Sequence, residues 1–151
     1  YFSQNIMNEI YQKIDPHDFM KNVDYHLSFS EKDEPQLYIV VNEQIDGEAE
    51  SYRPEWYFST AQLNTVAFSS FFGRALSTKN LAFRTIFVDD PISHFDDMNV
   101  LGFSDMIRSI IESMDCQIIM STHDRKIYNI LRRKLDDQYY SSCFIDLVKY
   151  E

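Results

Sequence analysis

The chain has 151 residues, which is enough for one domain with its own core. Apolar residues make up 44% and aromatic residues 15%, with only 3 Gly and 4 Pro, so a disordered chain or a flexible linker is excluded. No apolar run reaches the roughly 18 to 20 residues of a membrane span, so we expect no membrane contact. No secretory signal opens the chain, and it begins at Tyr1 rather than Met. We therefore expect a piece of a longer, cytoplasmic protein.

The net charge is −10 and is unevenly distributed, since residues 1–50 hold 3 Lys and Arg against 11 Asp and Glu. An acidic surface repels phosphate backbones, so if the whole protein binds DNA, this piece is not expected to supply the main basic surface. The basic run Arg132-Arg133-Lys134 falls at the end of a predicted helix. It is either a solvated helix end matched to the helix dipole, which we favour, or a small nucleic-acid patch.

Two cysteines, Cys116 and Cys143, each lie in an apolar, strand-like run. This setting predicts reduced core cysteines of a cytosolic protein. Because the chain contains no Cys-x-x-Cys pair, we expect neither a disulfide nor a cysteine metal site.

The first fifty residues predict a helix followed by a hairpin. Residues 1–14 carry isoleucines four apart, and Pro16 ends this helix. Residues 23–29 and 36–42 read as strands joined by a polar segment, and Asp46-Gly47 marks a further turn. The alternating apolar residues of the two strands are Tyr25, Leu27 and Phe29 in the first and Leu37, Ile39 and Val41 in the second.

From residue 59 the pattern changes to alternating helices and short apolar runs. Helices are predicted over 62–76 and 97–113 and around residues 127–135. Strands are predicted over 85–88, 117–120 and 144–148, the first two as buried strands. The predicted apolar face of helix 62–76 consists of Leu63, Val66, Ala67, Phe71 and Ala75. This alternation predicts an α/β fold with a mostly parallel sheet covered by flanking helices.

The segment of residues 58–62, with the sequence FSTAQ, lies directly before the first long helix of this region. Ser59 and Gln62 fit a capping box, in which each side chain bonds the backbone of the other. A helix N-terminus with small and hydroxyl residues is also a ready site for a phosphate. The two interpretations are compatible, and the capping box alone accounts for the residues.

Two carboxylates, Asp89 and Asp90, follow the apolar strand of residues 85–88. Like charges side by side repel each other unless a cation or water lies between them, and Mg²⁺ bound through carboxylate and water would relieve the repulsion. The alternative is a turn in which the two residues cap the loop before Pro91. Farther along, Asp96 or Asp97 is the expected N-cap of helix 97–113.

A histidine, His123, stands just after the predicted strand 117–120 and just before a helix. Strand ends of this kind are where α/β proteins place their sites. The alternative is a structural histidine, with Thr122 or Asp124 capping the helix.

In order and spacing these features resemble the C-terminal half of an ABC-type ATPase head, a P-loop NTPase fold, of the SMC-like kind. Residues 58–62 resemble a divergent Leu-Ser-Gly-Gly-Gln signature, and residues 86–91 resemble Walker B with the catalytic acid after it. Residues 93–96 resemble the D-loop, and His123 resembles the switch histidine. The SMC-like group includes chromosome-maintenance, double-strand-break-repair, RecF and RecN type proteins.

The resemblance implies that two heads clamp ATP and Mg²⁺ between them. Asp89 would hold Mg²⁺, Asp90 would orient or deprotonate the attacking water, and His123 would contact the γ-phosphate. Asp96 would cross the dimer interface. Cofactor contacts in trans are implied for the signature residues Ser59, Thr60, Ala61 and Gln62. The expected partners are a second head, in a homodimer, and DNA through the full-length protein.

Three departures from the family pattern affect these expectations. Thr60 and Ala61 replace glycines, so the backbone approaches phosphate less freely. Asp90 replaces the commoner Glu, so slow hydrolysis is expected. The chain also lacks a Gly-x-x-x-x-Gly-Lys-Ser/Thr loop. The resemblance assigns that loop to an N-terminal lobe across a long coiled coil, so the chain alone is expected to be inactive.

We therefore expect residues 1–22 to be the end of a coiled coil and residues 23–151 to be the C-terminal lobe of the head. The full protein would hydrolyse ATP to control DNA repair, recombination or defence against foreign DNA. Two rivals stay open. One is a metal-dependent nuclease or phosphatase that uses Asp89, Asp90 and His123 as direct ligands. The other is a catalytically weak dimerisation scaffold.

Overall fold

The computed structural model describes residues 2–14, 19–29, 35–45, 48–78, 83–92 and 95–147. The elements in chain order are α1 (Phe2–Ile14), β1 (Asn22–Ser28), β2 (Gln36–Ile45), β3 (Glu48–Tyr52), the short 3₁₀ helix η1 (Pro54–Trp56), α2 (Thr60–Ser77), β4 (Thr85–Asp89), α3 (Asp97–Ser113), β5 (Gln117–Ser121) and α4 (Arg125–Lys134). None of the described helices has the length and hydropathy needed to cross a membrane.

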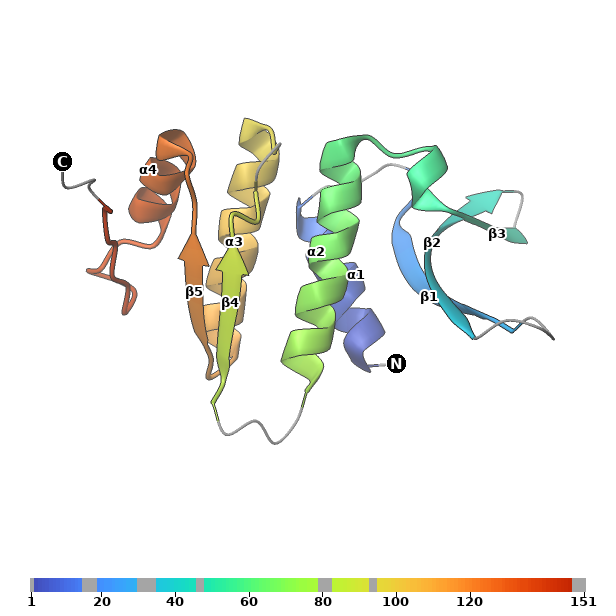
Figure 1. Cartoon of the computed structure of the whole chain (residues 1–151), viewed down its shortest axis with the longest axis horizontal. Helices are drawn as coiled ribbons and strands as arrows, with labels where there is room; N and C mark the ends of the chain where they lie inside the picture. The colour runs from blue at the N-terminus through green and yellow to red at the C-terminus, as the bar shows by residue number, and fades with distance from the viewer. Residues whose placement is uncertain are drawn as a thin grey trace.

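The strands form two small sheets, β1-β2-β3 and β4-β5, with α1 and α2 between them (Figure 1). The predicted α/β class is confirmed. The prediction of a mostly parallel sheet is not confirmed, because within the described residues only β4 and β5 run parallel and the other sheet is antiparallel.

The three-stranded sheet begins with the predicted hairpin of β1 and β2, in which Val23 lies opposite Val41 and both are fully buried. These two valines pack with Met7 and Tyr11 of α1 and Val66 of α2. Strand β3, which the sequence pattern did not predict, pairs with the other edge of β2. The predicted turn at Asp46-Gly47 lies outside the described residues.

The predicted apolar face of this hairpin is only partly buried. Tyr25 is half-buried, and its hydroxyl lies 2.7 Å from Ser70 Oγ on α2. Leu27 lies opposite Leu37 farther along the strands, and both are exposed, as is Phe29. The far ends of β1 and β2 extend beyond the part of the sheet that packs on α1 and α2, so the apolar residues at these ends stay exposed.

The buried side of helix α2 differs from the apolar face that the sequence predicted. Val66 is buried as expected, but Ala67 and Phe71 are exposed. Phe68 and Phe72 fill the core instead, with their ring centroids 4.5 Å apart. The helix carries apolar residues on several sides, so periodicity alone did not decide which side would be buried.

The parallel pair β4–β5 packs on α3 through one face only. Ile86 is buried on this face with Val100, Phe103 and Ile107 of α3. The prediction that these are buried strands is therefore only half right. Phe87 is 69% exposed and Ile119 is 45% exposed. Successive side chains of a strand point to opposite faces, so these two residues mark a face that no described element covers. In Figure 1 that face is turned toward the viewer.

The C-terminal segment corrects another prediction, because residues 144–147 form no strand, and Val148 lies outside the described residues. The segment runs beside α4, where Phe144 meets the ring of Tyr128 edge-on at 5.7 Å and Asp146 pairs with Arg125. Cys143 is exposed here, contrary to the predicted core position, whereas Cys116 is partly buried against the main core.

Candidate functional site

The site predicted from the sequence lies along one edge of the molecule. The carboxyl ends of β4 and β5 and the starts of α2, α3 and α4 all lie along the upper edge in Figure 1. Helix N-termini direct unsatisfied N–H groups and positive dipole ends toward this edge, which suits anions. The predicted site residues that the structure describes lie at these five ends.

The strand ends bring Asp89 next to Ser121. The two residues are register partners in the parallel pair, and the hydroxyl of Ser121 donates to Oδ1 of Asp89. The next residue, Asp90, donates its backbone N–H to the carbonyl of Ser121 at 3.0 Å. Asp90 has a φ of 45°, in the left-handed region that Asp tolerates better than most residues. This conformation turns the chain away from the sheet immediately after β4.

The carboxylate of Asp90 is engaged through both of its oxygens. Thr122 Oγ1 donates to Oδ1 at 3.1 Å, and His123 Nδ1 lies 2.6 Å from Oδ2. The Asp90 side chain is 28% exposed, whereas the His123 side chain is 78% exposed. His123 therefore contacts the acid through one ring nitrogen and leaves Nε2 to face outward.

Helix α4 begins directly after this cluster, and its N-cap is Asp124. The Asp124 carboxylate accepts from the N–H groups of Lys126 at 2.7 Å and Ile127 at 3.3 Å. The capping role that the sequence left open between Thr122 and Asp124 therefore belongs to Asp124. Thr122 instead accepts the N–H of Asp124 at 3.2 Å and donates to Asp90.

The start of α2 forms the complete capping box that the sequence predicted. The N–H of Gln62 donates to Ser59 Oγ at 3.3 Å, and the N–H of Ser59 donates to Gln62 Oε1 at 2.9 Å. Ser59 and Thr60 are exposed, and Ala61 and Gln62 are half-buried. These contacts leave the Ser59 hydroxyl proton and the Gln62 amide group as donors at an open helix end.

The start of α3 is capped by Asp96, as one of the two predicted choices. Asp96 Oδ1 accepts the N–H of Asn99 at 2.8 Å, and the residue is exposed. The neighbouring Asp97 pairs with Lys126 of α4 at 2.5 Å. The earlier residues of the predicted D-loop, 93 and 94, lie outside the described residues.

Within the described ranges, no three His, Cys, Asp or Glu side chains converge as a direct metal site, and this includes Asp89, Asp90 and His123. The rival that makes these three residues direct ligands gains no support, because His123 Nδ1 is directed at Asp90 instead. Sequence reasoning missed Ser121 altogether, and it considered Thr122 only as a possible helix cap and not as a partner of Asp90. The signal that could have found them is the strand register, because each acidic residue contacts the residue 32 positions later, Ser121 for Asp89 and Thr122 for Asp90.

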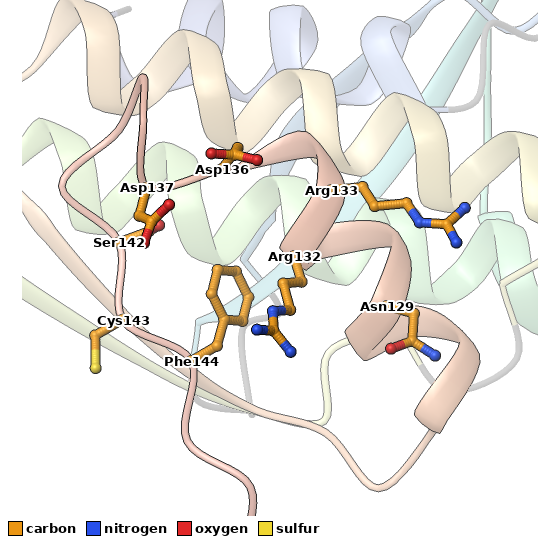
Figure 2. Close-up of a pocket in the computed structure, with 8 residues that line it drawn as sticks. All are labelled: Asn129, Arg132, Arg133, Asp136, Asp137, Ser142, Cys143 and Phe144. Atoms are coloured by element: carbon orange, nitrogen blue, oxygen red, sulfur yellow. The ribbon is translucent and has the colours of Figure 1, made fainter.

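A separate hollow of about 650 Å³ lies between α4 and the segment that follows it (Figure 2). Figure 2 shows Arg132 directed toward Phe144, while Arg133 extends away from the segment. The hollow lies at the end of α4 opposite His123 and includes no predicted site residue. Nζ of Lys134, the third residue of the basic run, lies 3.4 Å from Oδ1 of Asp105 on α3. One of the three positive charges of the run is therefore paired with an acid.

No family model and no curated protein matches the chain. Solved structures do match. The SMC head bound to the C-terminal winged-helix domain of ScpA matches with a TM-score of 0.61 and 19% identity, over 88% of this chain and 36% of that one. An SMC ATPase studied for ATP-driven dimerisation and DNA-stimulated activation matches with a TM-score of 0.59 and 16% identity, over 89% and 73%.

The chain has the fold of part of an SMC ATPase head. A third structure agrees: the Smc head domain with an extended coiled coil, bound to the C-terminal domain of ScpA from Pyrococcus furiosus, matches with a TM-score of 0.53 and 16% identity. This match covers 88% of the present chain and 30% of that one. The match therefore covers only about a third of the length of each of the two ScpA-bound SMC heads.

Proposed function

We propose that the chain is the C-terminal lobe of an SMC-like head, and that the full protein hydrolyses ATP between two engaged heads. The observation that carries this proposal is the contact of Asp90 with His123 at the carboxyl ends of a parallel strand pair. An acid at that position can orient or deprotonate a water, and a histidine beside it can donate to a phosphate oxygen, which are two tasks in the hydrolysis of a bound nucleotide. The likeness to SMC heads supplies the fold in which they act.

The proposed roles follow from the position and the remaining lone pairs or donors of each side chain. Asp89 has one oxygen bonded to Ser121 and is exposed, so its carboxylate fits Mg²⁺ held through water, which would neutralise phosphate charge. Asp90 orients or deprotonates the attacking water. His123 presents Nε2, which donates to a γ-phosphate when the ring carries both protons.

The signature segment acts on the nucleotide held by the other head. Ser59 and Gln62 keep their remaining donors despite the capping box, and Thr60 and Ala61 lie in the first turn, whose N–H groups point outward. Asp96 uses one oxygen to cap α3 and keeps the other for the dimer interface.

A missing N-terminal lobe explains the uncovered sheet face. Phe87 and Ile119 present apolar side chains on the side of β4 and β5 opposite α3. Apolar side chains on a sheet face are normally buried by another layer. We propose that a lobe with the phosphate loop covers this face and extends the pair into the mostly parallel sheet of an ABC-type head. Helix α1 would then be the end of the coiled coil that connects the lobes.

The same comparisons support two of the proposed partners, a second head and a ScpA-like protein. One similar protein was studied for ATP-driven dimerisation and two are bound to ScpA. We propose a homodimer of heads, a ScpA-like partner, and DNA contacted by other parts of a cytoplasmic protein. The process is DNA repair, recombination or defence.

The test mixes two full-length variants that are each inactive. In one, Ser59→Arg fills the space that a γ-phosphate needs. In the other, the lysine of the phosphate loop on the missing lobe is changed to Ala. If Ser59 acts in trans, a mixed dimer keeps one intact composite site, so phosphate release should recover in the mixture. Dimer formation is checked by light scattering.

Absence of recovery at every mixing ratio, with mixed dimers shown to form, would contradict action in trans. The matched control is Ser70→Arg on the same helix, away from its N-terminus. Ser70 contacts Tyr25 rather than the proposed site, so a folded head with this change should still form ATP-dependent dimers.

A further inference from the structure

The hydroxyl of Thr122 has a fixed direction. It accepts the N–H of Asp124 at 3.2 Å and lies 3.1 Å from Asp90 Oδ1. A threonine hydroxyl carries one proton, and the contact with Asp124 occupies one of its lone pairs. The proton is therefore available for Asp90, so this oxygen of the acid is held as an acceptor. Thr122 is half-buried, which limits the rotamers it can adopt.

The two partners of Asp90 differ in how firmly they are held. His123 is mostly exposed, and its described contact is the one with Asp90. Thr122 is joined to Asp124, whose carboxylate is fixed by two N–H groups in the first turn of α4. The first turn of α4 is joined in turn to α3 through Lys126 and Asp97. Of the two contacts to Asp90, the Thr122 contact is therefore the one built on a rigid element.

We propose that Thr122 is the positioning residue for Asp90, fixing the carboxylate in the orientation that activates water. This inference rests on the proposed function and deepens it. Asp90 is one methylene shorter than the usual Glu and stands at a positive φ, so its carboxylate has little length with which to correct a wrong orientation. A general base must lie within hydrogen-bonding reach of the water it activates, and small misplacements are costly. Without the Thr122 hydroxyl, an exposed histidine alone would hold the acid.

The test compares three variants in the full-length protein. Thr122→Val removes the hydroxyl at nearly constant volume and should lower kcat by about 10-fold or more, the scale seen when a supporting hydrogen bond to a site group is lost. The KM for ATP should change little, because Thr122 is not proposed to touch nucleotide. Thr122→Ser keeps the hydroxyl and should restore most of kcat. Thr85→Val is the matched control, because it removes a 3.3 Å hydroxyl contact to Gln117 between the same two strands at their other end.

The decisive comparison is made in the Asp90→Asn background. If Thr122 acts through Asp90, Thr122→Val should have no further effect on kcat there. An equal loss from Thr122→Val in both backgrounds, or an equal loss from Thr85→Val, would overturn the proposal in favour of a structural role. If Asp90→Asn slows hydrolysis but Thr122→Val does not, this inference fails and the proposed function stands. If Asp90→Asn leaves hydrolysis unchanged, both fail.

Discussion

Asp90 and His123 meet across the loops that follow two neighbouring parallel strands, with Nδ1 of the histidine 2.6 Å from Oδ2 of the acid. The strands place the two residues at one edge because Asp89 and Ser121 are register partners at the last rung of the pair. Asp90 lies beyond the end of the strand and is partly exposed, outside the apolar core, so removing its charge should change the reaction rather than the fold.

The first prediction concerns this acid. In the full-length protein, Asp90→Asn should slow ATP hydrolysis by roughly 10²- to 10⁴-fold, the usual range for a positioned base. ATP binding should persist, and ATP-bound dimers should accumulate. Phosphate release and light scattering measure the two effects. Asp89→Ala should abolish the Mg²⁺-dependent turnover, and intact Mg²⁺-dependent turnover in that variant would refute the Walker B assignment.

The second prediction separates the two roles of Ser59. Aspartate caps helices as well as serine does, so Ser59→Asp should keep the stability of α2, whereas Ser59→Ala should lose about 1 kcal/mol. If Ser59 also faces the partner's γ-phosphate, the new negative charge should nevertheless abolish ATP-dependent dimerisation. Thermal unfolding and light scattering give the two readouts. Normal dimers of Ser59→Asp would leave the capping box as the whole role of this residue.

The third prediction concerns the crossing of α1 and α3 at Gly102. A Cβ atom there would lie 2.6 Å from the carbonyl oxygen of Lys13 and 3.1 Å from the Cα of Ile14, both backbone atoms. Gly102→Ala should therefore lower the free energy of unfolding by about 1 to 3 kcal/mol, as overpacking does. Urea denaturation measures it. A gain of about 0.5 to 1 kcal/mol, the ordinary result of Gly→Ala within a helix, would show that the crossing has room.

The fourth prediction concerns thiol reactivity. Burial raises the pKa of the Cys116 thiol, the negative charge of Asp115 adds to this, and Arg84 opposes it. The thiolate is the nucleophile, so a raised pKa leaves less of it at a given pH. At pH 8, iodoacetamide should label the exposed Cys143 before Cys116, and labelling of Cys116 should still accelerate as the pH rises further. Mass spectrometry of Cys116→Ser and Cys143→Ser variants assigns each rate, and faster labelling at Cys116 would refute the assignment.

The local elements of the site could be predicted because they depend on short patterns. The capping box of Ser59 and Gln62 follows from residue type and spacing alone, and the same signals narrowed the cap of α3 to Asp96 or Asp97, of which the structure has Asp96. The meeting of Asp90 with His123 follows once two apolar runs are taken as neighbouring parallel strands. The hydroxyl partners Ser121 and Thr122 required the exact register, which the sequence does not state.

Other features were not predictable because they depend on what covers each face. Phe87 and Ile119 read as core residues, yet the described chain leaves them exposed. An apolar run is the same whether its second face is covered by this chain or by another lobe. Strand β3, with the sequence EAESY, lacks apolar alternation, and its place comes from pairing with β2. The extended segment that includes Phe144 has strand-like composition, but no described strand lies beside it to complete a ladder.

Helix α1 has a mechanical consequence. It supplies Ile6, Ile10 and Ile14 to the core of the parallel pair, and Met7 and Tyr11 to the core of the antiparallel sheet. The two cores therefore lie on different sides of α1, which packs on β1 directly and reaches the parallel pair through α3. A rotation of α1 about its own axis would therefore act on both cores at once. Such a rotation would act directly on the hairpin and, through α3, on the strand ends that hold Asp90.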